Sequence, residues 1–214
     1  MDFIDIHTHY NSPVFSLSEK AKNAKSIYSI EPEDHLIDPC SLGLHPWHLE
    51  NYPFRLQSLI QQAISPMVVA IGEAGLDKLC STPLTLQQQA FEAHILLSEE
   101  LQKPLIIHCV KAWRELETMR KKESPSQPWI IHGFRGKPEL ATQLLNKGYY
   151  LSFGTLHNPI SVRLAWPLSI LSETDDKDIS IVQVVEKLAD TLALPFNQVA
   201  KQLVQNAQRI FRML

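Results

Sequence analysis

The sequence has few of the residues that mark several common protein classes. It contains three cysteines in 214 residues, none of them in a C-x-x-C pair, which argues against a disulfide framework and excludes a zinc ribbon. Its seven glycines include no G-x-G-x-x-G or G-x-x-x-x-G-K spacing. A Rossmann dinucleotide site or a Walker-type phosphate loop is therefore not expected.

An excess of positive charge is also missing, because 20 basic residues face 23 acidic ones for a net charge of −3. This balance argues against a strongly basic nucleic-acid coat protein but leaves room for a local basic groove. No apolar run approaches the ~20 residues of a membrane span, and the N-terminus lacks the basic and apolar regions of a signal peptide. We expect no membrane partner and a cytoplasmic location.

What the sequence does contain is a series of short apolar runs, and 44% of its residues are hydrophobic. Most of these runs are continuous rather than alternating, which is typical of strands covered on both faces of a parallel sheet. Eight strands are predicted: Phe3–Ile6, Ser26–Ile30, Cys40–Leu44, Val68–Gly72, Leu105–Ile107, Trp129–Ile131, Tyr149–Phe153 and Leu168–Ser172.

Helical patterns separate most of these runs, and the clearest is Leu84–Leu101, with one apolar stripe. Weaker helices are predicted at 54–64, 111–122 and 138–146, and the tail is predicted to end in two helices, 179–192 and 195–211. The stretch 154–166 looks too broken for a long helix. The alternation predicts an α/β fold, a TIM-like (β/α) barrel that is short for its type, as one domain over residues 1–214. The alternative is an open doubly wound sheet, and hydrophobic periodicity alone does not distinguish it from the barrel.

Histidines and carboxylates stand at the ends of the predicted strands. Asp5, His7 and His9 follow D-x-H-x-H spacing on the first run. Residues two apart on an extended strand share a face, so the two histidines can hold one cation. An isolated H-x-H is equally often a surface coincidence, and the other strands therefore matter.

Four more strands carry the same residue types at or just beyond their ends: Glu73, His108, His132 and Asp175. In a parallel barrel all carboxyl ends of the strands meet at one rim, where the active site lies. A mixed set of nitrogen and oxygen ligands suits one or two divalent metals with open positions rather than a closed structural site. His35, His94 and His157, by contrast, read as ordinary surface or helix residues.

The order of these motifs resembles that of the TatD-like metal-dependent hydrolases. The chain carries Phe-Ile-Asp-Ile-His7-Thr-His9, Ala-Ile-Gly-Glu73-Ala-Gly-Leu-Asp77, Pro-Leu-Ile-Ile-His108-Cys, Ile-His132-Gly-Phe and Ser-Glu173-Thr-Asp175. It is also similar at Gln87-x-x-x-Phe91, at Gly-Leu-His45-Pro and at Asn206-Ala-Gln-Arg-Ile-Phe211. Each motif alone is weak, but the ordered set covers nearly the whole chain.

The resemblance implies a role for each of these residues. His7, His9 and Asp175 would hold one divalent metal, His108 and His132 a second, and Glu73 would bridge the pair. Such a pair of ions activates a water for attack on a scissile phosphorus and stabilises the leaving oxygen. Glu73 and Asp175 would be catalytic, with Asp175 as general base, His45 would contact substrate, and Asp77 would orient a ligand or simply form a turn.

The sequence departs from the family pattern in several places. Ile6 precedes the first histidine where Ser, Thr or Ala is common, and Val110 with Lys111 follows the His-Cys pair where arginine is common. The chain is also shorter than is usual, with the losses around 31–39 and 155–166. These differences bear on the substrate more than on the metals.

Three functions remain open. The favoured one is a dinuclear phosphodiesterase, similar to TatD-type deoxyribonucleases, with DNA or a small phosphoester as substrate and a monomeric state. An amidohydrolase or esterase on a small molecule is the second, although that group commonly bridges its metals with a carboxylated lysine rather than a glutamate such as Glu73. A binding protein derived from the enzyme is the third. Zn, Mn, Mg and Ni all fit the ligand types.

Three basic residues follow the predicted ligands along the chain. Lys78, Lys111 and Arg135 come a few residues after Glu73, His108 and His132 respectively, in loops expected to overlook the barrel mouth. Each alone is most often a solvated loop charge. Together they predict a local positive collar that binds substrate phosphate.

Overall fold

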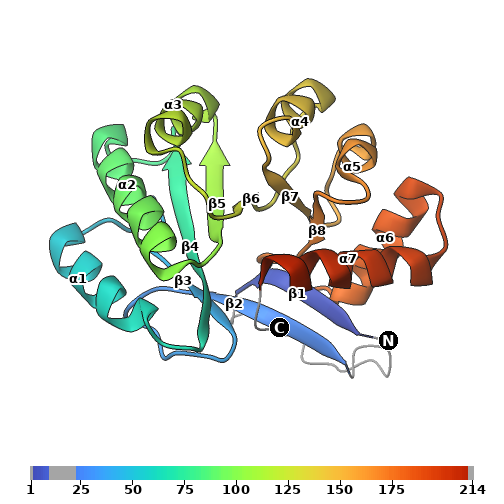
Figure 1. The fold of residues 1–214 in the computed structure, drawn as a ribbon, viewed down its shortest axis with the longest axis horizontal. Helices are drawn as coiled ribbons and strands as arrows, with labels where there is room; N and C mark the ends of the chain where they lie inside the picture. Colours follow the sequence, from blue (N-terminus) through green and yellow to red (C-terminus); the bar gives the residue numbers. More distant parts are fainter. Residues whose placement is uncertain (1, 10–22, 212–214) are drawn as a thin grey trace. The chain divides into compact units, whose positions relative to one another are not determined.

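The computed structural model describes residues 2–9 and 23–211 and alternates strands with helices along most of that length (Figure 1). The chain divides into two compact units. The first contains the residues up to Tyr28 and those from Ile130 onward, and the second is Ser29–Trp129. Each unit is built from parallel strands with helices packed on them.

The first unit brings the two ends of the chain together. Its parallel strand pairs are β1 with β2, β6 with β7 and β7 with β8, and Thr8 bridges to Asp175, just beyond β8. The first and last strands are therefore side by side, as a closed barrel requires. The strands are β1 (Phe3–Thr8), β2 (Ala24–Ile30), β6 (Trp129–Ile131), β7 (Tyr150–Phe153) and β8 (Ile170–Ser172).

Four helices belong to this unit: α4 (Pro138–Leu145), α5 (Pro159–Ala165), α6 (Ile181–Leu192) and α7 (Phe196–Ile210). Helices α6 and α7 pack on each other and on β1 and β8 (Figure 1). The short α5 lies in the stretch predicted to be too broken for a long helix. Its start is stabilised by Asn158, whose side chain accepts hydrogen bonds from the N–H groups of Ile160 and Ser161.

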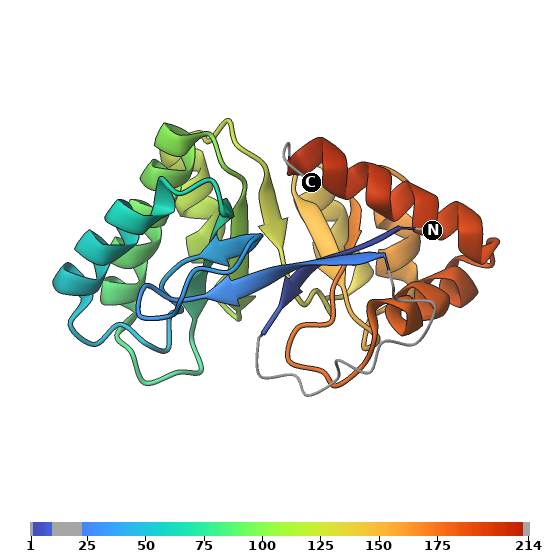
Figure 2. The same cartoon turned by 90° about the horizontal axis from the view of Figure 1, so that it is seen from below.

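The second unit places β3 (Cys40–Leu42), β4 (Val68–Asp77) and β5 (Leu105–Val110) side by side in parallel. Its helices are α1 (Tyr52–Ala63), α2 (Leu84–Leu101) and α3 (Trp113–Glu123). Figure 2 shows α1 beside α2, and α2 packs on β4. Strand β4 runs on to Asp77, well beyond the predicted end at Gly72, so Glu73 lies within the strand rather than after it.

The core of each unit is made of the apolar runs that predicted the strands. In the second unit Phe91 and Trp129 are almost fully buried and meet edge to face at 5.6 Å. In the first unit Phe134 and Phe153 do the same at 5.9 Å. The end of β2 pairs with the chain after β3 through the bond from Gly43 N–H to Ile30 O. Within each unit the paired strands follow sequence order, with β1 beside β2 and β6, β7 and β8 in a row in the first, and β3, β4 and β5 in a row in the second.

In the described parts of the chain, none of the helices is both long enough and apolar enough to cross a membrane.

Asn206 explains part of the C-terminal motif. This fully buried residue on α7 donates from Nδ2 to the carbonyls of Pro167 and Ile170, at 2.8 and 2.9 Å. Both carbonyls flank the start of β8, the strand that leads to Asp175. The amide therefore attaches the last helix to the strand that positions a candidate site residue.

We expect Asn206→Ala to lower the free energy of unfolding by about 2–4 kcal/mol, because two buried carbonyls lose their donor. Urea unfolding followed by circular dichroism measures this change. Gln208→Ala, at an exposed position on the same helix, is the matched control and should change the midpoint little. Equal midpoints for the two variants would contradict the role assigned to Asn206.

Candidate metal centre

Backbone hydrogen bonds between β1 and the chain after β8 set the first group of candidate ligands. Asp175 N–H donates to His7 O at 2.9 Å, and His9 N–H donates to Asp175 O at 3.2 Å. Asp175 has φ +57°, a left-handed conformation that Asp tolerates better than most residues and that is enriched at functional sites. These backbone hydrogen bonds and this conformation place the Nε2 atoms of His7 and His9 at 3.8 and 3.7 Å from Asp175 Oδ1.

His132, at the end of β6, joins this group. Its ring centroid is 4.3 Å from that of His7, and His7, His132 and Asp175 each offer a ligand atom, with these atoms all within 4.8 Å of one another. Two imidazoles and a carboxylate at this spacing can share one divalent cation. The donor set of the first unit thus fits divalent metal, and it brings His132 next to His7 and Asp175.

Glu173 directly follows β8 and is fully buried. Its Oε1 accepts a hydrogen bond from Gly133 N–H at 2.5 Å and lies 3.6 Å from His132 Nδ1. Burial alone would raise the pKa of Glu173, but its interactions with His132 and His7 outweigh burial and hold the pKa below its usual value. A carboxylate behind a histidine orients the ring and favours binding of a cation by the other nitrogen.

Asp5 links β1 to the loop that carries Asp175. It is 3% exposed and accepts hydrogen bonds from His7 N–H, from Thr174 N–H and from Thr174 Oγ1, at 3.3, 3.1 and 2.6 Å. Burial raises its pKa to about 7, although these hydrogen bonds act in the opposite direction. The residue therefore positions two candidate ligands and carries a proton up to nearly neutral pH.

In the second unit the candidate ligands gather around Glu73. Its Oε1 lies 2.9 Å from His108 Nδ1 and 3.2 Å from His45 Nε2, and the three residues form a group whose ligand atoms are all within 4.8 Å. All three side chains are largely buried. His45, predicted to contact substrate, thus lies beside two predicted ligands.

Two glycines allow Glu73 to sit where it does. A Cβ on Gly72 would approach Ile106 O to 2.2 Å, and one on Gly75 would approach His108 O to 2.0 Å. Both residues have positive φ, +110° and +152°. Only glycine permits this backbone to lie so close to β5, which explains the Gly-Glu-Ala-Gly motif in physical terms.

Asp77 orients His108 from the other side of the ring. Its Oδ2 lies 3.2 Å from His108 Nε2 and accepts a hydrogen bond from Trp47 Nε1 at 2.7 Å, while Oδ1 accepts from Leu79 N–H at 2.7 Å. Burial alone would raise the pKa of Asp77, but these partners outweigh burial and lower it. Of the two predicted interpretations, a ligand-orienting residue or a turn former, the contacts support both, since Asp77 also begins the turn to Leu79.

Gln87 on α2 holds the backbone of Asp77 by two hydrogen bonds. Asp77 N–H donates to Gln87 Oε1 at 2.7 Å, and Gln87 Nε2 donates to Asp77 O at 2.9 Å. Phe91, one turn later on the helix, packs against Trp129 in the core. The Gln-x-x-x-Phe motif therefore anchors α2 on β4 and fixes the direction of Asp77.

The sequence predicts His94 to be an ordinary surface or helix residue, and it is a helix residue with a positioning role rather than a surface one. It lies on α2 but is fully buried. Its Nε2 accepts from Leu44 N–H at 2.9 Å, so Nδ1 carries the proton and donates to Ala90 O at 2.7 Å. Burial lowers its pKa to about 4, and the neutral ring fixes the backbone immediately before His45. In the sequence His94 lies on an apolar helix face, and that pattern does not indicate a buried polar contact.

The loop of His45 is held from a second side by charged residues. Glu31 Oε1 accepts a hydrogen bond from His45 N–H at 3.3 Å and lies 3.0 Å from His48 Nδ1. Arg55 on α1 contacts Glu31 Oε2 through Nη2 at 2.5 Å. This ion pair therefore holds Glu31 against the His45 loop.

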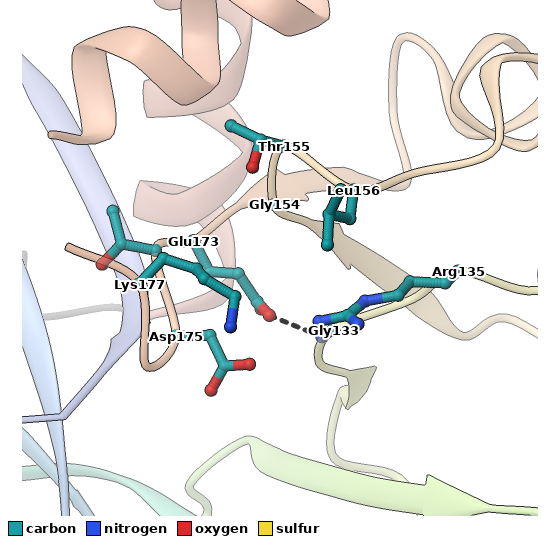
Figure 3. A pocket seen from close by; sticks show the side chains of 9 residues that line it. Gly133, Arg135, Gly154, Thr155, Leu156, Glu173, Asp175 and Lys177 are labelled. Carbon is teal, nitrogen blue, oxygen red and sulfur yellow. Dashed lines mark hydrogen bonds between the residues drawn. The ribbon is translucent and has the colours of Figure 1, made fainter. Parts of the chain in front are cut away.

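The three predicted basic residues differ in their surroundings. In the second unit, Lys78 Nζ forms an ion pair with Glu115 Oε1 at 2.8 Å, and Lys111 is exposed, with φ +55°. In the first unit, Arg135 lines a hollow together with Asp175 (Figure 3). Arg135 therefore lies next to a candidate ligand, whereas an acidic neighbour offsets the charge of Lys78.

A parallel α/β fold with histidines and carboxylates gathered at strand ends defines the class of metal-dependent hydrolases. The family model described as TatD related DNase matches residues 14–212. The chain belongs to the TatD family of metal-dependent hydrolases. Its fold is the predicted TIM-like (β/α) barrel, because the crystal structure of the TatD homologue YjjV from Escherichia coli K12 superposes with a TM-score of 0.81, at 25% identity and over 99% of this chain and 98% of that one.

Two curated relatives illustrate the range of similarity. The uncharacterized metal-dependent hydrolase YabD of Bacillus subtilis is 32% identical over 168 residues, which is 68% of this chain and 66% of that protein. The human 3′-5′ RNA nuclease TATDN2 is 36% identical over 119 residues, which is 53% of this chain and 16% of that protein.

Asp5 generates a prediction about pH. In the unfolded chain its carboxyl ionises near 3.8, whereas the folded chain keeps the proton to about 7. Between these values the folded state binds more protons, so this group makes folding less favourable as pH rises. Asp5→Asn imitates the protonated carboxyl. In the chelator-treated variant, the free energy of unfolding should therefore decline less between pH 3.8 and about pH 7 than in the unaltered protein. Above about pH 7 the variant should be more stable by a few kcal/mol.

Urea titrations at a series of pH values measure that slope. Asp190→Asn, at an exposed position on α6, is the matched control and should leave the slope as in the unaltered protein. The same slope for Asp5→Asn and the unaltered protein would contradict a raised pKa at Asp5.

Asp77 generates a second prediction. Asp77→Asn replaces one carboxylate oxygen by an N–H₂ group, which cannot accept a hydrogen bond. One amide cannot then accept from both Trp47 Nε1 and His108 Nε2, so His108 loses its fixed orientation. We expect affinity for divalent metal to fall by about 10–100-fold. Trp47→Phe, which leaves the carboxylate in place, should cost less. Metal titration by calorimetry distinguishes the two, and equal affinities in all three proteins would show that Asp77 only forms the turn.

Proposed function

We propose that the chain, acting as one domain over residues 1–214, is a metal-dependent phosphodiesterase that hydrolyses nucleic acid or a small phosphoester. The observation that carries this proposal is Glu73, a buried carboxylate within β4 with His108 Nδ1 at 2.9 Å and His45 Nε2 at 3.2 Å. A glutamate in this position differs from the carboxylated lysine common in amidohydrolases. The nuclease activity named for the relative TATDN2 supports the same choice.

The donor sets of both units fit divalent metal. His7, His9 and Asp175 in the first unit would hold one ion, His108 and His132 the second, and Glu73 would bridge them. Bound metal would polarise a phosphoryl oxygen and lower the pKa of water. Imidazole and carboxylate ligands accept Zn, Mn, Mg or Ni.

The residues of the chain then have separate tasks. Asp175, braced by Asp5 through Thr174, would act as general base towards the attacking water. His45 would contact the substrate, and its loop is held in place by His94 and Glu31. Lys78, Lys111 and Arg135 would bind substrate through attraction of their positive charge to phosphate.

The test begins with elemental analysis of the purified protein, followed by chelation and add-back of each metal in turn. We expect hydrolysis of bis-p-nitrophenyl phosphate to exceed that of p-nitrophenyl acetate and of an anilide, and to depend on the added metal. Activity on the anilide alone would favour the amidohydrolase alternative. Metal content without hydrolysis of any substrate would favour the binding protein.

Glu73→Gln keeps the shape of the side chain but removes its charge. We expect this variant to lose at least one metal and to fall by 100-fold or more in kcat, on the order of 3 kcal/mol in the barrier, with an unchanged circular dichroism spectrum. Glu100→Gln, at an exposed position on α2 of the same unit, is the matched control. Full metal content and full rate in Glu73→Gln would refute the bridging role.

A further inference from the structure

A hollow lies next to Asp175 in the first unit. It is open to solvent, and its lining includes Gly133, Gly154 and Thr174. Arg135 and Lys177 both line it, and Figure 3 shows the guanidinium of one and the amine of the other directed into the space in front of Glu173 and Asp175. Two cations from different loops thus face one small volume beside the proposed general base.

The backbone holds Lys177 in this place. Its N–H donates to Thr174 O at 3.1 Å, which closes a turn around Asp175. The amine forms an ion pair with Asp176 Oδ1 at 2.7 Å, but the Asp176 side chain is 65% exposed. An exposed pair of this kind contributes little free energy, so a doubly charged anion in the hollow can replace it.

The carboxylates around the hollow do not prevent this. Glu173 is buried and already accepts the hydrogen bond from Gly133 N–H. Asp175 is a proposed metal ligand, and a divalent cation there offsets its charge. With metal in place, Arg135 and Lys177 leave the hollow positive, and positive charge in a partly enclosed site attracts anions.

Thr155 and Leu156 complete the lining of the hollow. Among the residues that the structure describes, the two cations are therefore its only basic lining residues, and a phosphate is the substrate group that they would attract.

We propose that the Arg135–Lys177 hollow binds a second, non-reacting phosphate of the substrate. The preferred substrate is then a phosphodiester that carries a terminal phosphate monoester. This inference rests on the proposed function and narrows it, because a terminal phosphate is dianionic near neutral pH whereas an internal phosphodiester carries one charge. Lys177 would act through KM, since it contacts the part of the substrate that does not react.

The experiment compares three substrates of the metal-loaded protein: the thymidine dinucleotide TpT, its 5′-phosphorylated form pTpT and its 3′-phosphorylated form TpTp. We expect kcat/KM for one phosphorylated form to exceed that for TpT by about tenfold or more, as one or two charge-assisted hydrogen bonds would give. Which of the two forms is preferred identifies the end that the hollow binds.

Lys177→Ala should abolish most of this preference through a higher KM, with kcat and the rate on TpT unchanged. Lys201→Ala, at an exposed position on α7, is the matched control and should retain the preference. An equal loss on all three substrates, or no loss on any, would overturn the assignment of the hollow.

A binding measurement separates this inference from the proposed function. Calorimetric titration with thymidine 3′,5′-bisphosphate, and with thymidine as reference, requires no turnover. Absence of hydrolysis of all three dinucleotides would refute the proposed function, and the hollow would still be supported if the bisphosphate binds about tenfold more weakly to Lys177→Ala. Equal affinity of the variant and the unaltered protein would refute the hollow even if hydrolysis is observed.

Discussion

The pairing of β1 with the chain just beyond β8 is the constraint on which the first unit depends. Asp175 donates to the carbonyl of His7 and accepts from the N–H of His9, so three candidate ligands share one short stretch of ladder. Their side chains approach one another because their backbones are hydrogen-bonded. Any shift in this register would move both histidines relative to the carboxylate, since side chains alternate between the faces of a strand.

In the second unit, the candidate ligands are positioned by glycines and buried side-chain hydrogen bonds. Glu73 lies in a strand flanked by two glycines that permit close approach to β5, and His108 lies between the carboxylates of Glu73 and Asp77. Buried hydrogen bonds from α2 then fix the surroundings, with Gln87 on Asp77 and His94 on the residue before His45. Any movement that breaks one of these hydrogen bonds leaves a buried polar group unpaired, which costs free energy. The paired network is therefore rigid.

Much of the fold was predictable because it follows from local patterns. Continuous apolar runs such as Leu105–Ile107 and Trp129–Ile131 are typical of covered strands, and each lies in one. Asp5, Glu173 and His94 were not recognisable as positioning residues. Their partners, Thr174, Gly133 and Leu44, lie up to 169 residues away along the chain, and no local pattern encodes a contact of that separation. The sequence did not predict the short helix α5 for a different reason. Its seven residues form too few turns for a clear apolar stripe.

The sequence by itself determined the residue types at the strand ends, and with them the chemistry: histidines and carboxylates that suit divalent metal, in the order of the TatD family. This was possible because strand type and strand end are local properties. Only the tertiary structure decided how the groups combine, placing His132 with His7 and Asp175, His45 with Glu73 and His108, and Lys177 beside Arg135. Such grouping depends on strand register, backbone conformation and loop path, which distant parts of the chain set together.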